Sequence, residues 1–458
     1  MKGMSIQAIA QACNGVLYGD KGNTAEVQGV ELDSRKLKEG YLFIATKGER
    51  VDGHSFIPQA FEKGCYGVVC ETLPEEFAGP CIVVEDSLKA LQDIAAFYRE
   101  QLLVKVIGIT GSVGKTSTKE VIAGVLSQKY NVLKTEGNYN NEIGLPLTVL
   151  KIREEHEVAV LEMGINHFGE MHRLSRVAKP DICVITNIGQ CHLEFLIDRD
   201  GILRAKSEIF DYMNPCGTVC LNGDDDKLAT IEAVHGKKPV FFGKSGHCEV
   251  KAKDIETLGL EGSKALVEEK GGEESFAIRL YMPGEHMVLN ALAAIAVGRT
   301  LGLTTDELIN GIAKTGSVGG RSNIIKDECL TVIDDCYNAN PVSMKAAIDL
   351  LDTAKGRKVA LLGDMFELGN KERELHREVG SFLTGKKVDT VICVGELSKE
   401  IYEGAKAGDA HCIWFATKKE LTENIHQLIQ KSDTVLIKAS HGMGFSELVE
   451  LCSAHTWL

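Results

Sequence analysis

Long apolar segments, paired cysteines and an excess of positive charge are all missing from this sequence of 458 residues. No run approaches the ~18–20 apolar residues that cross a membrane, and the start of the chain lacks the apolar core of a signal peptide. The 14 cysteines include no Cys-x-x-Cys pair, and several lie in apolar runs, which is typical of buried thiols in a reducing cytosol. The net charge of −14 argues against a nucleic-acid-binding surface. We therefore expect a cytoplasmic protein with no membrane span and no nucleic-acid partner.

The length of the chain exceeds what a single core usually holds, so two or three domains are expected. Apolar runs that alternate with helical patterns predict an α/β protein. We expect a small mixed α/β domain over residues 1–103, a central phosphate-loop domain with a parallel sheet over 104–317, and a Rossmann-like domain over 318–458. Polar alternation over 247–281 indicates an antiparallel insert, and the strand at 330–333 should be the first of the last domain.

The most informative motif lies at residues 107–120, where an apolar strand runs into a glycine loop and then a helix that begins at Lys115. Here Gly111 and Gly114 let backbone N–H groups face phosphate oxygens, Lys115 reaches the β- and γ-phosphates, and Thr116 offers its hydroxyl to Mg²⁺. Ile109 stands where the longer motif has glycine, so an ordinary glycine turn is the alternative interpretation. The pattern favours a nucleoside triphosphate site formed by Gly111, Ser112, Val113, Gly114, Lys115, Thr116 and Ser117.

Glu162 and His192 each follow a predicted strand of the central sheet. Because the carboxyl ends of parallel strands meet at one edge, both should lie near the phosphate loop, where they could bind Mg²⁺. Taken alone, Glu162 could be an exposed ion-pairing carboxylate and His192 a structural histidine. His167 and His172 are expected at the surface or as capping residues, and Lys206 is, by its position, a lysine on an amphipathic helix.

The last domain has a polar segment at the end of its first predicted strand, residues 334–341. Such residues suit nucleotide or substrate binding, although Asn and Pro there also build turns. The preceding segment, 315–320, is rich in glycine and predicts a hinge. Arg321, directly beyond it, could move onto a γ-phosphate when the domains close.

Together these segments resemble the Mur ligases, the ATP-dependent amide-forming enzymes of peptidoglycan synthesis. The segments that carry the resemblance extend over the whole chain and are residues 33–35, 47–54, 110–116, 136–146, 162–164, 337–341 and 362–369. Asn140–Gly144 and Tyr337–Pro341 resemble in particular the members that join D-alanyl-D-alanine to UDP-N-acetylmuramoyl-tripeptide through an acyl phosphate.

The resemblance implies that the first domain holds the UDP-sugar, the central domain holds ATP with two Mg²⁺ ions, and the last holds the amino substrate. It implies a monomer whose catalytic residues are Lys115, Glu162, His192, Lys206 and Arg321. The metal ligands would be Thr116, Glu162, His192 and a Lys206 carbamylated by CO₂. Further nucleotide-binding residues would be Asn290, Arg321, Asp335 and Tyr337. Substrate-binding residues would be Ser34, Arg35, Lys47, Gly48, Asp52, His54, Asn138, Asn141, Asn338 and Asn340.

Three positions depart from the family pattern. Phe195–Asp198 replaces a glycine-containing segment, Met287 stands where asparagine is usual, and His441 replaces an arginine, which removes a permanent positive charge. The alternatives are another Mur-type or polyglutamate-adding ligase, a nucleotide-dependent switch or binding module, and an inactive paralogue. The sequence leaves open whether the tripeptide carries lysine or diaminopimelate at its third position.

Overall fold

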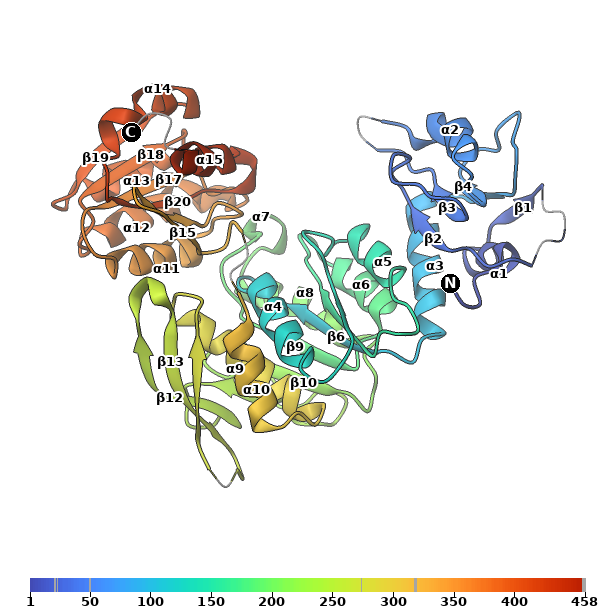
Figure 1. Ribbon diagram of the computed structural model, residues 1–458, viewed down its shortest axis with the longest axis horizontal. Coiled ribbons are helices and arrows are strands. Elements are labelled where there is room, and N and C mark those ends of the chain that lie inside the picture. Colours follow the sequence, from blue (N-terminus) through green and yellow to red (C-terminus); the bar gives the residue numbers. More distant parts are fainter. Residues whose placement is uncertain (20–21, 23, 49–50, 273, 317–318, 455–458) are drawn as a thin grey trace.

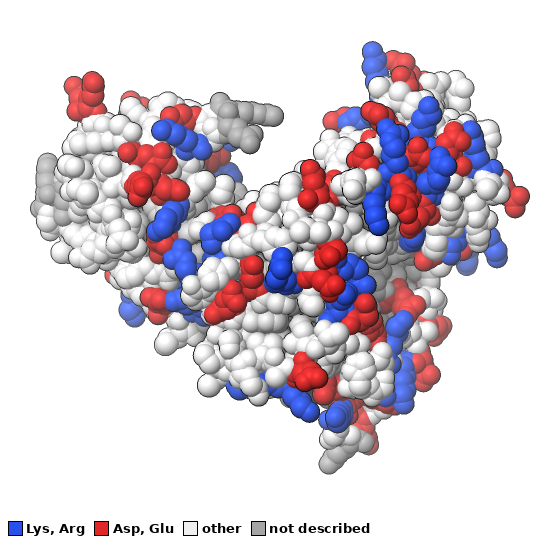
Figure 2. Space-filling model, turned by 180° about the vertical axis from the view of Figure 1, so that it is seen from behind, with Lys and Arg blue, Asp and Glu red and all other residues white. Residues whose placement is uncertain are grey.

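The computed structural model describes residues 1–458 except 20–21, 23, 49–50, 273, 317–318 and 455–458. Three α/β domains follow one another, and the N-terminal and C-terminal domains lie at opposite ends of the central one (Figure 1). Seen from behind, a notch separates the two outer lobes, and basic and acidic side chains are interspersed over this face (Figure 2). Within the described ranges, no helix combines the length and apolar character needed to cross a membrane. Glu49 and Arg50, and Ser317 and Val318 of the expected hinge, lie outside the described residues.

The N-terminal domain is built on a small sheet with the strand order β1-β5-β4-β3-β2. β1 and β5 pair antiparallel, whereas the other neighbours are parallel. The strands are β1 (Val16–Tyr18), β2 (Gly29–Glu31), β3 (Tyr41–Ile44), β4 (Gly67–Cys70) and β5 (Cys81–Val83). The helices are α1 (Ile6–Ala12), η1 (Gly53–Phe56), α2 (Ile57–Glu62) and α3 (Ser87–Glu100).

Helix α3 joins this domain to the next one. It begins after Asp86, whose carboxylate accepts hydrogen bonds from two N–H groups of its first turn. Near its end, the Tyr98 hydroxyl donates to the carbonyl of Ile152 (2.7 Å) and the Arg99 Nε donates to that of Ala178 (3.0 Å). One apolar core runs from α1 and α3 into the central domain. The N-terminal sheet is therefore carried on a helix that is anchored in its neighbour.

The central domain has a sheet in the order β14-β13-β12-β11-β10-β9-β6-β8-β7. Its strands are β6 (Lys105–Thr110), β7 (Val132–Lys134), β8 (Val158–Glu162), β9 (Ile182–Ile185), β10 (Thr218–Asn222), β11 (Val240–Gly243), β12 (Val250–Thr257), β13 (Ser263–Glu269) and β14 (Phe276–Leu280). From β7 at one edge to β12 in the sheet order, all neighbouring strands pair parallel. β13 pairs antiparallel with β12 and β14, which confirms the predicted insert.

Two apolar cores cover the faces of this sheet. The helices of the first core are α5 (Gly144–Val149), α6 (Glu170–Ala178) and α8 (Arg199–Ser207), and those of the second are α4 (Lys115–Leu126), α9 (His286–Thr300) and α10 (Thr305–Lys314). The shorter elements are α7 (Leu193–Leu196), η2 (Glu208–Phe210), η3 (Leu228–Thr230) and η4 (Gly259–Glu261). The burial of both faces explains the nearly continuous apolar runs of β6, β8 and β9.

The C-terminal domain has the strand order β15-β16-β20-β17-β18-β19. Its strands are β15 (Asn323–Lys326), β16 (Thr331–Asp334), β17 (Lys358–Gly363), β18 (Thr390–Val394), β19 (His411–Phe415) and β20 (Thr434–Lys438). Its helices are α11 (Pro341–Asp352), η5 (Gly369–Lys371), α12 (Glu372–Leu383), α13 (Ser398–Ala405), α14 (Lys418–Leu428), η6 (His441–Met443) and α15 (Ser446–Ala454).

One prediction for this domain is wrong. The strand expected to be its first, near 330–333, is preceded by β15, which pairs antiparallel with it. β15 is a short edge strand whose residues are half-buried or exposed, so it lacks the apolar run of the parallel strands beside it. The remaining neighbours are parallel, as the sequence predicts.

Candidate active site

The carboxyl ends of the central strands open onto a cleft of about 1240 Å³ between the central and C-terminal domains. Opposite walls come from the segment after β6 and from the segments that follow β16, β17 and β20. The cleft brings together most of the predicted nucleotide-binding residues, namely Ser112, Val113, Gly114, Lys115, Ser117, Asn290, Arg321, Asp335 and Tyr337. It also includes Glu162, His192, Asn138, Asn141, Asn338 and Asn340.

The phosphate loop, residues 111–116, has the backbone that its sequence predicts. Gly114 precedes α4 with a φ of +84°, in the left-handed region that favours glycine. A Cβ on Gly111 would lie 1.9 Å from the Thr186 Oγ1, so no side chain fits there. The Lys115 Nζ donates to the Gly111 carbonyl (2.8 Å), and burial lowers the pKa of Lys115 although Glu162 attracts its charge. The ammonium is thus held over the loop.

Glu162 is the buried acid of this site, with 1% of its surface exposed. Its Oε2 accepts from the Thr116 hydroxyl (2.9 Å), and its Oε1 accepts from the Asn140 amide (2.8 Å). The Lys119 Nζ lies 3.7 Å away and donates to the carbonyl of Thr135. A carboxylate and a hydroxyl beside a phosphate loop are the hard oxygen donors that fit Mg²⁺.

Sequence reasoning missed the roles of Asn140 and Lys119 around this acid. Lys119 follows Lys115 by one helical turn, so its position on the same face could have been noticed. Asn140 lies inside a segment that carried the family resemblance, but its contact with Glu162 depends on how two distant segments pack.

His192 does not face Glu162. Its Nδ1 lies 2.6 Å from the Oε2 of Glu367 in the C-terminal domain, and this hydrogen bond lowers the pKa of Glu367. Both residues have a left-handed backbone, with φ of 51° and 61°. Among the residues that the structure describes, no group of three His, Cys, Asp or Glu side chains converges as a ready metal site. Thr116 and Glu162 are therefore brought together, whereas His192 is paired across the domain interface.

Lys206 lies at the end of α8, as predicted, with only 1% of its surface exposed. Its pKa is lowered to about 8, mainly by burial; Cys191 opposes this shift and the nearby charge of Lys115 adds to it. No ion pair or hydrogen bond of its ammonium is found among the described residues. A buried amine with a lowered pKa is more often neutral than an ordinary lysine.

The C-terminal wall of the cleft carries charged and aromatic side chains that contact one another. The Arg321 guanidinium lies over the Tyr337 ring at 4.1 Å, and the His441 ring lies 5.5 Å from the same tyrosine. Lys438 is buried and contacts Asp335 at 2.5 Å. Arg321 and Asp335 thus face the cleft as predicted.

Two asparagines of this wall also have local structural partners. The side chain of Asn340 accepts from the N–H of Ser343 and caps α11, and that of Asn338 accepts from the N–H of Ala339. Turn building, the alternative interpretation, therefore applies to both residues in this structure, although both line the cleft.

The residues predicted to bind the UDP-sugar in the first domain lie outside this cleft. Their side chains form contacts within their own domain: Ser34 with Gln59, Arg35 with Asp33, Lys47 with Glu71, and Asp52 with His54. The Arg35 guanidinium holds the pKa of Asp33 at about 2. Gly48 lies in the same region of the chain. These residues are not brought to the phosphate loop in this arrangement of domains.

Known proteins match this chain along nearly its whole length. Three family models match in order: "Mur ligase family, catalytic domain" over residues 26–99, "Mur ligase middle domain" over 109–298, and "Mur ligase, glutamate ligase domain" over 320–441. The UDP-N-acetylmuramoyl-tripeptide–D-alanyl-D-alanine ligase of Bacillus subtilis is 40% identical, with 97% of each chain covered. The chain belongs to the Mur ligase family.

Solved MurF structures superpose on nearly the whole chain. MurF from Acinetobacter baumannii superposes with a TM-score of 0.91 at 35% identity, covering 98% of this chain and 99% of the other. MurF from Thermotoga maritima, solved in complex with ADP, has a TM-score of 0.83 at 31% identity and covers 93% and 97%. The three-domain α/β fold and the use of ATP are thereby established for this Mur ligase.

Two positions that depart from the family pattern lie against site residues. The Sδ of Met287 accepts from the Asn290 amide (3.3 Å), whose oxygen accepts from the hydroxyl of Thr118. The Phe195 ring packs on His167 at 4.3 Å, next to the segment that carries His192. Both substitutions are accommodated by direct contacts.

Proposed function

We propose that this protein uses ATP to join D-alanyl-D-alanine to UDP-N-acetylmuramoyl-tripeptide during peptidoglycan precursor synthesis. The observation that carries the proposal is the phosphate loop with its buried Thr116–Glu162 pair, which faces Arg321 across a cleft between two domains. Relatives that share the whole chain length are named for this reaction. A monomer in the cytoplasm is part of the same proposal.

The reaction requires charge neutralisation and alignment more than a protein nucleophile. The γ-phosphoryl group is transferred to the terminal carboxylate of the tripeptide, which forms an acyl phosphate and ADP. The amine of D-alanyl-D-alanine then attacks the acyl carbon, and inorganic phosphate leaves from the tetrahedral intermediate. Lys115 holds the transferred group from the loop side and Arg321 from the C-terminal side. Bound Mg²⁺ would neutralise phosphate charge, with Thr116 and Glu162 as its ligands at one site.

Lys206 supplies the second anionic ligand of this proposal as a carbamate. The ammonium first loses a proton, and the neutral amine then attacks the carbon of CO₂, which forms an N–C bond, releases a second proton and leaves an anionic carbamate. The supporting observations are its burial, its pKa of about 8 and the lack of an ionic partner among the described residues. The carbamate and His192 would bind the second Mg²⁺, which requires His192 to leave Glu367.

Domain closure completes the site in this proposal. Ser34, Arg35, Lys47, Gly48, Asp52 and His54 would hold the UDP-sugar in the first domain, with Asn138 and Asn141 at the cleft. The last domain, through Asn338 and Asn340, would hold the amino substrate. Because the outer lobes are separated in Figures 1 and 2, their substrates meet only after the domains approach one another.

Phosphate release measured with each substrate omitted in turn tests this function. We expect release that requires ATP, UDP-N-acetylmuramoyl-tripeptide and D-alanyl-D-alanine together, and a product that mass spectrometry identifies as the pentapeptide. A nucleotide-dependent switch would release phosphate without the organic substrates. Release with a different amino acceptor would instead indicate another Mur-type or polyglutamate-adding ligase, and no release with any acceptor would indicate an inactive paralogue.

A further inference from the structure

The segment that carries His192 is fixed to the phosphate loop by backbone and side-chain hydrogen bonds. We call residues 186–192 the histidine loop. The Asn187 side chain accepts from the N–H of Val113 (3.0 Å) and donates to the carbonyl of the same residue (2.9 Å). The N–H of Gly189 donates to the Ser112 Oγ (2.9 Å). Hydrogen bonds therefore join the phosphate loop to the histidine loop.

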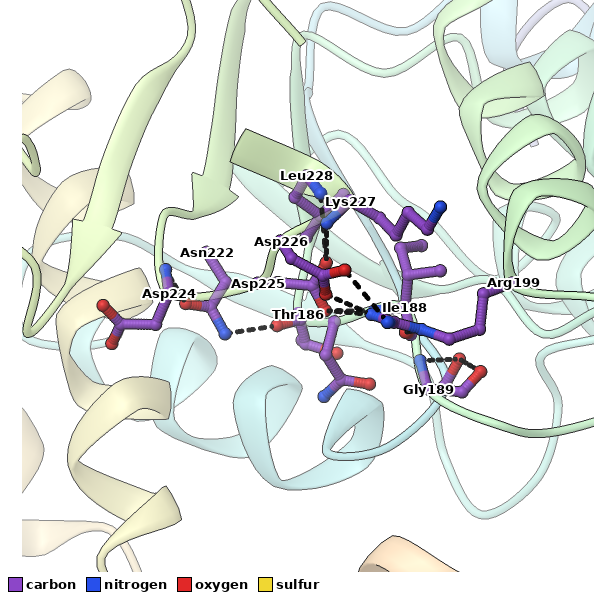
Figure 3. Close-up of polar contacts among 12 residues, drawn as sticks. Thr186, Ile188, Gly189, Arg199, Asn222, Asp224, Asp225, Asp226, Lys227 and Leu228 are labelled. Atoms are coloured by element: carbon purple, nitrogen blue, oxygen red, sulfur yellow. Dashed lines mark hydrogen bonds and ion pairs between the residues drawn. The ribbon is translucent and has the colours of Figure 1, made fainter. Parts of the chain in front are cut away.

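The opposite side of the histidine loop is held by three side chains, which come from β10, from the turn after β10 and from α8. The N–H of Ile188 donates to the Asp225 Oδ2 (2.8 Å), and the carbonyl of Ile188 accepts from the Arg199 Nε (2.8 Å). Asn222, at the end of β10, donates to the carbonyl of Thr186 (3.0 Å). Figure 3 shows Ile188 between Asp225 and Arg199, with the outer end of Arg199 turned toward Asp226.

Asp225 uses both carboxylate oxygens for backbone groups. While Oδ2 holds Ile188, Oδ1 accepts from the N–H groups of Lys227 and Leu228, both at 3.0 Å. The side chain is only 8% exposed. An asparagine has one acceptor oxygen, so at this position it must give up either the histidine loop or the turn at 227–228. Three backbone N–H groups thus occupy most of the acceptor sites of this carboxylate, which is engaged in support.

Arg199 links this support to the other residue proposed to bind metal. It lies in the first turn of α8, and Lys206 lies in the last turn of the same helix. One guanidinium therefore fixes the start of the helix of Lys206 to the backbone four residues before His192. The planar guanidinium can contact two partners at once: its Nε donates to the Ile188 carbonyl, and both terminal nitrogens contact the Asp226 carboxylate.

We propose that Asp225 and Arg199 are positioning residues, which place the phosphate loop, His192 and Lys206 relative to one another by clamping Ile188. The proposal rests on the proposed ligase function for its kinetic part, and it makes a separate prediction for the nucleotide-free protein. Both residues border the cleft. Their side-chain hydrogen bonds go to the histidine loop, to the turn at 227–228 and to Asp226, so we expect each to act through the histidine loop. Partners behind metal-binding residues usually affect metal affinity or activity by about 10–100-fold.

The central test is Asp225→Asn with Asp200→Asn as the matched control. Asp200 lies on α8 next to Arg199, is 72% exposed and pairs with Lys227. Among the described residues, none of its hydrogen bonds or ion pairs reaches the histidine loop. In the nucleotide-free protein, we expect amide hydrogen exchange in a peptide covering 186–192 to become about tenfold faster in Asp225→Asn. We expect the Mg²⁺ concentration for half-maximal activity to rise about 10–100-fold. The KM for D-alanyl-D-alanine should stay within about twofold, since that site is elsewhere.

Arg199→Lys is the second variant, needed if Asp225→Asn does not fold. Lysine keeps the charge beside Asp226 but cannot serve Ile188 and Asp226 together, so the same two shifts are expected. The inference is overturned if folded variants show the exchange and the Mg²⁺ dependence of Asp200→Asn. It is also overturned if every kinetic constant worsens in parallel with a lower melting temperature, as a purely structural role predicts. Failure of the wild-type protein to make the pentapeptide would reject the proposed function, while the exchange result would still decide the clamp.

Discussion

Two lysines of helix α4 should respond in opposite ways to the loss of their charge. Lys115 and Lys119 are one turn apart, yet their surroundings differ. The Lys119 side chain is 2% exposed, and its Nζ contacts the carbonyl of Thr135 at 2.7 Å, Glu120 at 3.2 Å and Glu162 at 3.7 Å. The Lys115 Nζ contacts the Gly111 carbonyl at 2.8 Å, and burial lowers its pKa. The fold itself supplies the partners of the Lys119 ammonium, whereas we propose that the Lys115 ammonium is held for a phosphate ligand.

We expect Lys115→Met to abolish turnover without loss of stability. Because the pKa of Lys115 is lowered in the folded state, the fold disfavours its charged form, and this effect opposes stability at neutral pH, where the unfolded chain carries the charge. Methionine removes the charge, so the free energy of unfolding should stay the same or rise. Turnover should fall about 10²–10³-fold, the usual effect of losing one preorganised electrostatic partner.

Lys119→Met is the contrasting variant. It removes the cation that lies 3.7 Å from the buried carboxylate of Glu162, and it leaves the Thr135 carbonyl without its donor. Breaking a buried ion pair by removing one partner typically costs about 3–5 kcal/mol, so this protein should unfold at a clearly lower urea concentration. The comparison therefore separates a lysine that we propose to bind the phosphates of ATP from one that supports the fold.

Phosphate release under saturating substrates and urea unfolding measure the two effects on the same preparations. The interpretation of the site would be refuted by a folded Lys115→Met protein that keeps activity within tenfold of wild type. A Lys115→Met protein less stable than Lys119→Met would refute the electrostatic argument, because it would give Lys115 the structural role that we assign to Lys119.

Three further outcomes are expected. Lys206→Ala should be nearly inactive, and short carboxylates should partly restore its activity. Wild-type protein in ¹³C-labelled bicarbonate should show a carbamate NMR signal. Absence of this signal under conditions in which the enzyme is active would contradict the modification. Small-angle scattering should show a smaller radius of gyration with nucleotide and UDP-substrate, and an unchanged radius at saturation would reject domain closure. Burial lowers the pKa of His376 from its ordinary value of 6.5, so its contribution to stability is full above that pH and is lost as the pH falls toward the folded-state pKa. Urea unfolding from pH 7.5 to 5 should show this loss in wild type and a weaker one in His376→Gln; identical profiles would exclude it.

The phosphate loop could be predicted because its information is local. An apolar strand, two glycines with special backbone freedom and a helix that begins at Lys115 lie within a few residues of one another, and each follows from short-range sterics. The same holds for the antiparallel insert and for the apolar parallel strands. β15 escaped prediction because a short, half-exposed edge strand has no strong periodicity, and its pairing with β16 depends on the finished sheet.

The pairing of the site residues could not be derived in this way. Thr116 and Glu162 were both predicted, but the support from Asn140 and Lys119 depends on how three segments pack. The contact of His192 with Glu367 joins residues 175 positions apart, in different domains. Spacing along the chain contains no measure of such a distance.

The sequence by itself determined the family, the order of the domains and many of the residues that line the cleft, because these follow from local patterns and from motifs held in a fixed order. Only the tertiary structure decided which of these residues meet. It placed the first-domain residues Ser34 and Arg35 away from the phosphate loop, turned His192 toward Glu367 and clamped Ile188 between Asp225 and Arg199. The physical reason is that long-range contacts depend on the packing of whole elements and on the relative position of domains, which short-range backbone preferences do not specify.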